Sequence, residues 1–593
     1  MSNPFVDYLN SMNNASSNTI AALAESQVLS PFYDKIQIER TLGNCISDSI
    51  RNGERITYVL TGHAGDGKTS ILVQVLKNLG LLEPNVPLKE EEQYSKNGIN
   101  LYTVKDMSAL PESTQVQFCR KALEAPLTNS SAIVISNTGP LLKCLEEIKR
   151  EQCEIDGEEF NESKKSMLQT LLLNQLDSNN NELITLGQYH FQLINIARVD
   201  NTSFAEKIYD KLLADDLWLP CEACDKKESC HIYFNVQQSK QYKTRMVSFI
   251  NAFYRYLYEN DKRMTIRQML SQISFAITGN RTCAQIPTHG KEITKFNFLY
   301  PNLFFGYAGL HEIDNADQIQ GIAYAREFML DSKALSADYE LFVSGNFDSL
   351  PSQIKNLAES QYKIYSKKHM NIDEEQDFNQ MDYEYRKAIR RLYLFFEHKN
   401  VDNPIYNPLY DELFGIGYND YIRLQNNEAS RSVTNKLQKT IVDALYLEMT
   451  GTSSKQISEL PLTIKRNDDS FQNVLLTTGK LKKTDLKIVS KEVSSTFEDD
   501  TKKHLVILRI RNTWDFTLTL PMVIYFGEIA TGAISTIANP ALTHGISKLK
   551  AVLEKSIADE DSNDDGIAII VNNTDVPLNL KLFIDDKLYI ENN

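Results

Sequence analysis

Cysteine is scarce in this chain, with eight residues among 593. So few thiols in so long a chain do not form a disulfide scaffold, and we expect the protein in the reducing cytoplasm. No run of about 20 apolar residues is present, so we expect no membrane-spanning segment. The first residues, Met1-Ser-Asn-Pro-Phe, have neither a basic start nor an apolar core, and we expect no signal peptide.

Basic residues are also in deficit. The chain has 63 Lys and Arg against 78 Asp and Glu, a formal net charge of −15. This balance argues against a protein that coats DNA non-specifically, because phosphate contacts need clustered cations. It does not exclude a local basic patch. Internal repeats and long low-complexity segments are absent, and a hydrophobic fraction of 42% supports several packed domains.

A glycine-rich stretch stands out against this background, since residues 61–70 read TGHAGDGKTS. An apolar run precedes it and a segment with helical spacing follows it, which is the strand–turn–helix context of a nucleotide-binding loop. Its glycines let successive N–H groups point into one concavity, where the positive end of the helix dipole also points. The alternative is an ordinary glycine-rich turn between a strand and a helix.

The spacing Gly62-x4-Gly67-Lys68-Thr69 matches the phosphate-binding loop of ATP-dependent proteins. We expect Lys68 to reach the β- and γ-phosphates and the Thr69 hydroxyl to bind Mg²⁺. The residues expected to contact the nucleotide are Gly62, His63, Ala64, Gly65, Asp66, Gly67, Lys68, Thr69 and Ser70.

The loop lies in a region, residues 57–202, that alternates short apolar strands with helices. This alternation predicts an α/β fold with a parallel sheet, here a P-loop NTPase core of the AAA+ or STAND kind. Ligands bind beyond the carboxyl ends of such strands. Residues 89–98 are predicted to be a polar loop. The candidate strands are residues 58–60, 100–104, 132–135 and 191–196.

Three further regions flank this core. Residues 1–56 are predicted to be mostly helical, and residues 203–455 form a helical lid or middle region. After residue 456 the pattern changes to short apolar strands with one helix, which predicts a C-terminal α+β module. The candidate strands there are residues 474–478, 486–489, 505–510, 516–520, 567–571 and 580–584, and the helix is residues 547–557.

ATP hydrolysis requires a second acid that helps to hold Mg²⁺ and aligns the attacking water. Asp106 is the best-placed carboxylate, although Lys105 interrupts the apolar run before it. A helix-capping or turn role for Asp106 is an equal alternative. Asn195 and Asp200, after a later strand, are weaker candidates.

Two other side chains could complete a catalytic site. Asn137 ends a purer strand and resembles the γ-phosphate sensor of AAA+ ATPases, while a simple turn role before Gly139 is the alternative. Arg267, at the head of a helix, could stabilise transition-state charge. A surface or salt-bridged role is the leading alternative for Arg267, and it is the expectation for Arg390 and Arg391.

A second signal is a cysteine cluster, Cys221-x2-Cys224-x5-Cys230, in a polar stretch. Such spacing resembles one side of a structural zinc knuckle. Zinc takes four ligands, and Cys283 is a better fourth than His231, whose position next to Cys230 makes joint ligation awkward. Free thiols are one alternative, and an iron–sulfur cluster, which also uses four cysteines, is a less favoured one.

The order of these elements resembles the DptF (DndF) family, the P-loop component of DNA phosphorothioation-dependent restriction systems. The segments that carry the resemblance are GHAGDGKT at 62–69, KDMS at 105–108, ISNTG at 135–139, the three clustered cysteines with Ile232 and Asn235, and LPMVIYFGEIATG at 520–532. The resemblance implies an ATPase subunit that acts with DptG- and DptH-like partners against DNA lacking phosphorothioate. It also implies that DNA is reached through this complex.

Three functions therefore remain open. The first is an ATPase whose turnover remodels a restriction complex, with cleavage supplied by a partner because no nuclease motif is present in the chain. The second is a STAND-type switch that binds ATP, senses phage and assembles an effector, with homo-oligomer formation as its mark. The third is an assembly scaffold in which the nucleotide is structural.

Overall fold

The computed structural model forms two compact units, made of the described residues up to 397 and of those from 404 onward. Helices between residues 409 and 450, which the sequence pattern groups with the middle region, belong to the second unit. None of the described helices combines the length and the apolar content that a membrane span requires. The structure describes residues 2–13, 30–82, 87–178, 182–287, 292–369, 375–397, 404–453, 457–464, 474–493, 504–532, 539–558, 567–571, 578–585 and 587–592.

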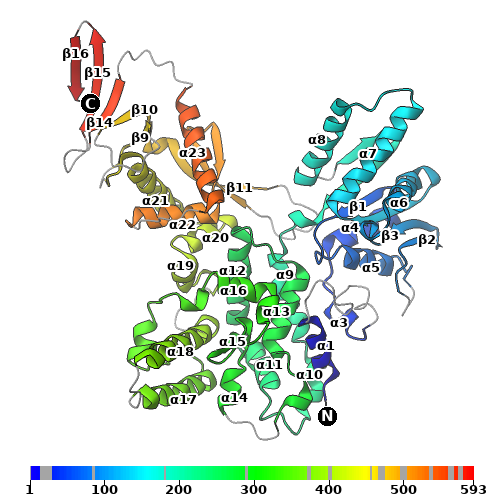
Figure 1. Cartoon of the computed structure of the whole chain (residues 1–593), viewed down its shortest axis with the longest axis horizontal. Helices are drawn as coiled ribbons and strands as arrows, with labels where there is room; N and C mark the ends of the chain where they lie inside the picture. Colours follow the sequence, from blue (N-terminus) through cyan, green and yellow to red (C-terminus); the bar gives the residue numbers. More distant parts are fainter. Residues whose placement is uncertain are drawn as a thin grey trace. The chain divides into compact units, whose positions relative to one another are not determined.

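A sheet with helices packed around it organises the first half of the first unit (Figure 1). It has six strands in the order β2-β3-β4-β1-β6-β5. The four inner strands are parallel, which confirms the predicted α/β fold with a parallel-rich sheet. Their carboxyl ends therefore meet at one edge of the sheet. These strands are β1 (Thr57–Thr61), β3 (Ile99–Val104), β4 (Ser131–Ser136) and β6 (Tyr189–Asn195).

The outer strands, β2 (Glu91–Lys96) and β5 (Leu183–Leu186), pair antiparallel with their neighbours. The prediction of a polar loop at 89–98 is therefore wrong. Asn97 and Gly98 both have positive φ, 53° and 76°, which is the backbone of a tight hairpin turn. An exposed edge strand tolerates polar side chains, so this charged segment lacks the apolar pattern of a strand. The Asn-Gly pair is the sequence signal of the hairpin that contains it.

Helices cover both faces of this sheet. Tyr58 and Leu60 pack with α4 (Thr41–Arg51) and α5 (Lys68–Asn78). Val59, between them, points the other way, because successive strand residues alternate in direction. It packs into a second cluster formed with three helices. Those helices are α6 (Glu112–Glu124), α7 (Thr138–Ile155) and α8 (Glu162–Ser178).

The rest of the first unit is mainly helical, as predicted, with one two-stranded ribbon of β7 (Tyr307–Ala308) and β8 (His311–Glu312). The amino-terminal helix α1 (Pro4–Asn13) packs along α13 (Ile266–Thr278), far from it in sequence. The prediction of helices in residues 1–56 is confirmed for α1, for the short α3 (Tyr33–Ile36) and for α4, while residues 14–29 lie outside the described part. The other main helices are α9 (Phe204–Leu212), α10 (Asp215–Glu222), α11 (His231–Gln241), α12 (Lys243–Glu259), α15 (Tyr300–Phe304), α16 (Gln320–Glu327), α17 (Ser352–His369) and α18 (Glu375–Phe396).

A buried ion pair holds α18 in place. The Arg391 guanidinium, fully buried, donates to Asp331 Oδ2 over 2.7 Å and to Asn302 Oδ1 over 2.9 Å. Its third donor reaches the carbonyl oxygen of Gly309 over 2.6 Å. Arg390 pairs with Asp338 over 2.7 Å. The predicted salt-bridged role of both arginines is confirmed.

The second unit is α+β. One sheet has the order β16-β15-β14-β10-β9, another has the order β11-β12-β13, and both are antiparallel. The candidate strand 516–520 is shorter than predicted, because Pro521 lies in the first turn of α22 (Leu520–Ala530), which begins there. The strands are β9 (Glu459–Ile464), β10 (Val474–Lys482), β11 (Leu486–Glu492), β12 (His504–Ile510), β13 (Trp514–Thr517), β14 (Ile567–Val571), β15 (Leu578–Asp585) and β16 (Lys587–Asn592).

Helices complete this unit. The predicted helix at 547–557 lies within α23 (Pro540–Ala558). The other main helices are α19 (Leu409–Phe414), α20 (Tyr418–Gln425) and α21 (Arg431–Thr450).

Candidate functional site

Residues 62–67 form the turn between the carboxyl end of β1 and the first residue of α5. Gly65 and Gly67 have φ of 88° and 87°, a left-handed backbone that residues with a Cβ rarely adopt. Gly67 is the N-cap residue of α5 and has no side chain that could bond to the first N–H groups of the helix. The turn thus presents backbone donors and the positive end of a helix dipole to one side of the sheet.

Lys68 lies across this turn. Its Nζ donates to the carbonyl oxygens of Gly62 and His63 over 2.8 and 2.9 Å. Partial burial lowers the pKa of the ammonium group, while the negative charges of Asp66 and Asp106 oppose that shift. The cation is therefore held near the concave side of the turn by neutral carbonyl groups, and an anion there would gain a positive partner.

Asp66 fixes the shape of the turn. The side chain is fully buried, and its Oδ2 accepts from the backbone N–H of His63 over 2.8 Å. Its Oδ1 accepts from Arg263 Nη1 over 2.6 Å. Arg263 precedes α13, so one carboxylate ties the turn to the helical region.

Asp106 and Asn137 follow neighbouring strands, β3 and β4. The Asp106 carboxylate accepts from the backbone N–H of Ser108 over 3.0 Å, which is the capping role expected as one alternative. The Ser108 hydroxyl in turn accepts from the backbone N–H of Asn137 over 2.7 Å. Both site candidates are exposed and face the cavity that Lys68 lines, so capping does not remove Asp106 from the site.

The weaker acid candidates have structural roles. Asp200 is buried, caps a short turn through Thr202, and pairs with Arg255 over 2.5 Å. The Asn195 amide caps the next turn by accepting from the backbone N–H of Ala197 over 3.1 Å. Neither residue lines the cavity that holds Lys68 and Asp106.

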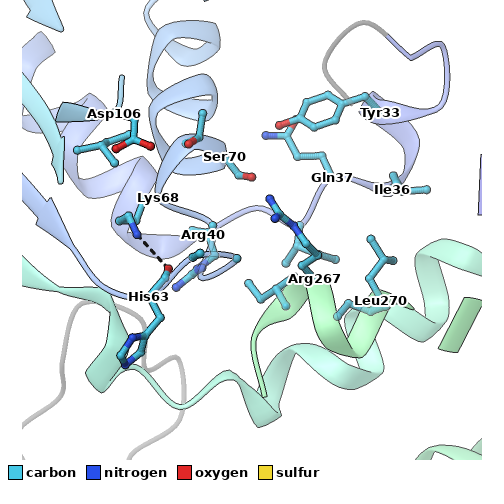
Figure 2. Close-up of a pocket in the computed structure, with 18 of the residues that line it drawn as sticks. Tyr33, Ile36, Gln37, Arg40, His63, Lys68, Ser70, Asp106, Arg267 and Leu270 are labelled. Atoms are coloured by element: carbon cyan, nitrogen blue, oxygen red, sulfur yellow. Dashed lines mark hydrogen bonds between the residues drawn. The ribbon is translucent and has the colours of Figure 1, made fainter. Parts of the chain in front are cut away.

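That cavity has a volume of about 250 Å³. Figure 2 shows Lys68 and Asp106 on one side of it, here called the polar end, and Ile36 and Leu270 on the other, here called the apolar end. The polar end holds Lys68, Thr69, Ser70, Asp106 and Asn137. Arg267, from the first turn of α13, lies in its wall, and burial lowers the pKa of its guanidinium. The structure brings together Lys68, Asp106, Asn137 and Arg267, the four residues singled out from the sequence.

The apolar end contains residues that the sequence did not reveal. They come from α3 and the segment after it, from α9 and from α13, and they belong to no sequence motif. Gln37 adds an amide at this end. The apolar side chains are Ile36, Ile38, Ile208, Ile266 and Leu270, with the ring of Tyr33 beside them.

The cysteine cluster also assembles. Cys221, Cys224, Cys230 and Cys283 line a second cavity, of about 290 Å³. As they stand, no three or more His, Cys, Asp or Glu side chains in the described residues are arranged so that they could hold a metal ion. His231 is not among the lining residues. Its Nε2 lies 3.2 Å from the carbonyl oxygen of Thr278, and burial lowers its pKa to about 4.

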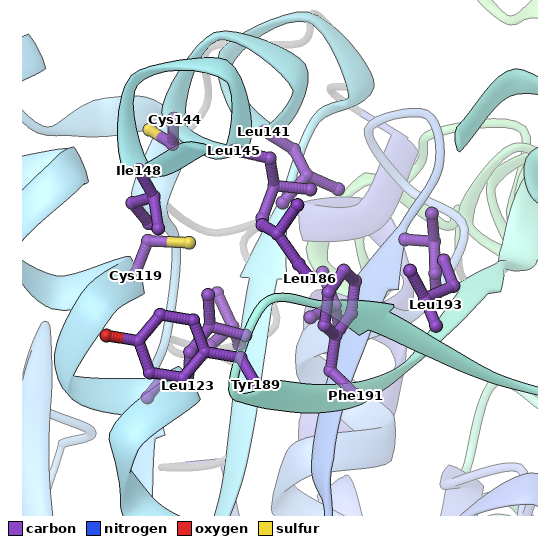
Figure 3. Packing of buried hydrophobic residues seen from close by; sticks show 14 of the residues in the cluster. Cys119, Leu123, Leu141, Cys144, Leu145, Ile148, Leu186, Tyr189, Phe191 and Leu193 are labelled. Carbon is purple, nitrogen blue, oxygen red and sulfur yellow. The ribbon is translucent and has the colours of Figure 1, made fainter. Parts of the chain in front are cut away.

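Other cysteines have a different environment. Cys119 and Cys144 lie among apolar side chains of α6, α7 and the sheet (Figure 3). Burial raises the pKa of Cys144 to about 11, so this thiol stays protonated at neutral pH. These two residues are ordinary core cysteines, in contrast to the four that line the second cavity.

A comparison with models of known protein families gave no match, and a comparison with curated protein sequences gave none either. The functional argument therefore rests on the residues and on their geometry.

Proposed function

We propose that the chain binds MgATP in the cavity between the 62–67 turn and α13 and hydrolyses it. The observation that carries this proposal is the convergence of Lys68, Asp106, Asn137 and Arg267 on one cavity whose base is the turn. Cationic and carboxylate side chains around a helix N-terminus suit a phosphate chain with its metal ion.

The two ends of the cavity match the two ends of the nucleotide. The triphosphate would lie on the turn, with Lys68 leaving the carbonyl oxygens of Gly62 and His63 for the β- and γ-phosphates. The base would enter the apolar end, where Ile208 and Leu270 offer flat contact and Gln37 offers an amide. Thr69 and Asp106 are the residues that would hold Mg²⁺, which neutralises charge on the phosphates.

Hydrolysis needs a water molecule in line with the γ-phosphorus. Asp106 would orient this water and accept its proton, as the bond from the γ-phosphorus to the β,γ-bridging oxygen breaks. The products are ADP, phosphate and a proton. Asn137 would hold the γ-phosphate, and Arg267 would stabilise the charge that develops on it.

We further propose that the chain serves as the ATPase subunit of a bacterial anti-phage restriction complex, acting on DNA without phosphorothioate. The support is the resemblance to the DptF family. DptG- and DptH-like subunits would be its partners, and DNA would be contacted through the complex, which agrees with the acidic net charge of −15.

A nucleotide switch of the STAND kind is the second candidate. It is favoured by the ties between the turn and α13, because Arg263 binds Asp66 and Arg267 lines the same cavity. A nucleotide bound between these elements would change how they are held together. Slow hydrolysis would then reset the switch.

Equilibrium binding of ATP to the full chain, followed by calorimetry with and without Mg²⁺, tests the proposal. Lys68→Ala should weaken binding by roughly tenfold or more, because a charge-assisted contact to phosphate is lost. Lys121→Ala is the matched control, since Lys121 on α6 pairs with Glu91 on β2 and does not line the cavity. Equal affinity in Lys68→Ala and the unchanged chain would contradict the proposed site.

A further inference from the structure

The four cysteines of the second cavity come from three separate places in the chain. Cys221 lies in the last turn of α10, and Cys224 follows this helix. Cys230 is the residue that caps α11. Cys283 begins a short turn after α13. Only the folded chain brings Cys283 to the other three, 53 residues beyond Cys230 by their numbers.

Three of the four sulfur atoms accept hydrogen bonds from N–H groups. The side-chain amide of Asn3 donates to Cys221 Sγ over 3.3 Å, and its backbone N–H donates to Cys283 Sγ over 3.5 Å. The backbone N–H of Tyr233 donates to Cys230 Sγ over 3.4 Å. A neutral thiol is a weak acceptor, whereas such donors are the usual outer partners of metal-bound thiolates.

The charges around the cavity also favour an anionic centre. Lys226 and Lys227 line it, and Lys226 Nζ donates to the carbonyl oxygen of Ile286 over 2.7 Å. One carboxylate, Asp225, lies beside Cys224, whose Sγ is 3.7 Å from Asp225 Oδ1. Four thiolates around a divalent ion carry a net charge of about −2, which the two lysines would balance.

We propose that Cys221, Cys224, Cys230 and Cys283 hold a metal centre with four thiolate ligands, which fastens the amino-terminal residues to the helical region. A divalent ion would bind as four S–H bonds give up their protons to solvent and four metal–sulfur bonds form. Each cysteine has one rotatable bond before its sulfur, and on binding the thiolates would turn onto the metal through rotamer changes and backbone shifts. This inference does not depend on the proposed ATPase activity.

The centre would also brace the nucleotide cavity from a distance. Helix α13 begins beside that cavity with Arg267 and ends shortly before Cys283, a length of about 20 Å for its 13 residues. Helix α1 packs along α13, and Asn10 Nδ2 donates to the carbonyl oxygen of Arg281 over 2.9 Å. Asn3, at the start of α1, reaches two of the four sulfur atoms. Loss of the metal should therefore loosen α1 from α13.

The test is the metal content of the full chain purified without a metal-affinity step, under anaerobic conditions. We expect about one zinc per chain or, for an iron–sulfur cluster, about four iron and four acid-labile sulfide with visible absorption. Cys224→Ser and Cys283→Ser should lower this content at least tenfold. Cys45→Ser is the matched control, because Cys45 is an exposed thiol on α4, and it should keep the full content.

A second measurement uses the unchanged chain, so it holds even if a cysteine variant fails to fold. Ellman's reagent should count about four additional reactive thiols after chelation, since metal-bound thiolates are protected. Zinc content and cluster absorption distinguish the two kinds of centre, and either supports the proposal. Equal metal content in the control and cluster variants, or an unchanged chain that stays metal-free after reconstitution with zinc or with iron and sulfide, would overturn it.

Discussion

Arg263 and Asp66 form an ion pair of 2.6 Å that joins the segment before α13 to the turn after β1. Asp66 is fully buried, and the same guanidinium donates through Nη2 to the carbonyl oxygen of Ile196 over 3.0 Å. Two features thus fix the conformation of the turn. Its glycines permit the left-handed backbone, and an arginine almost two hundred residues later in the chain binds its aspartate.

This pair makes Asp66 a stability determinant as well as a site residue. Asp66→Ala should lower the free energy of unfolding of the first unit by about 3 kcal/mol, because Arg263 and the His63 N–H lose their acceptor. Urea unfolding followed by circular dichroism measures the change. Asp48→Ala, which removes an exposed pair with Arg51, should change it by less than about 0.5 kcal/mol. Similar losses in the two variants would refute a special role for Asp66.

Substitution of Asp106 should lower the rate of hydrolysis and leave the affinity for ATP nearly unchanged. Asp106→Asn should reduce kcat for ATP hydrolysis by roughly 10²-fold, since the amide cannot accept the proton of the attacking water. The affinity for ATP should stay within about threefold, because the triphosphate is held mainly by the turn and Lys68. Steady-state kinetics and calorimetry give the two values.

Asp200→Asn provides the comparison for Asp106. Asp200 pairs with Arg255 outside the cavity, so its substitution should lower thermal stability and leave kcat of the folded enzyme unchanged. If Asp106→Asn hydrolyses ATP normally and Asp200→Asn does not, then Asp200 and not Asp106 is the acid that orients the attacking water.

The apolar end of the cavity should contact the adenine base of ATP. Leu270→Ala should weaken ATP binding by about five- to tenfold, the result of losing roughly 1 kcal/mol of apolar contact. Inorganic triphosphate, which has no base, should bind equally well to the variant and to the unchanged chain. Leu127→Ala, at an exposed apolar position in the short helical turn after α6, should affect neither ligand. An equal loss for ATP and triphosphate would place the base elsewhere.

Arg391 and Asp331 should show the behaviour of a buried ion pair. Asp331→Ala leaves the fully buried Arg391 without its carboxylate, and the free energy of unfolding should fall by about 3–5 kcal/mol. The double variant Asp331→Leu with Arg391→Met should recover a large part of this loss, because no buried charge remains. A double variant less stable than Asp331→Ala would show that the pair is net stabilising.

The sequence predicted the parallel strands because each is a short apolar run between helical segments, and strand order then placed Lys68, Asp106 and Asn137 at one edge of the sheet. It did not predict β2, since an edge strand has little apolar character to reveal it. The Asn97-Gly98 turn was the available signal.

The remaining parts of the site depend on contacts between distant segments. Gln37, Ile208 and Leu270 meet only in the folded chain, and none belongs to a local motif. The ion pair between Arg263 and Asp66 also could not be predicted, because neither segment contains a sequence pattern that indicates contact with the other. Cys283 was predicted as the fourth ligand because His231, next to Cys230, ligates awkwardly, and the structure brings Cys283 to the cavity of the other three.

Steady-state ATP hydrolysis by the purified chain, with and without duplex DNA and with Lys68→Ala as the comparison, is the most direct experiment. We predict Mg²⁺-dependent turnover that rises with DNA and is lost in Lys68→Ala. Tight ATP binding without a DNA response would favour the nucleotide switch. An ATPase rate that is the same in the unchanged chain and in Lys68→Ala, together with equal affinity for ATP, would contradict an ATP site on the 62–67 turn.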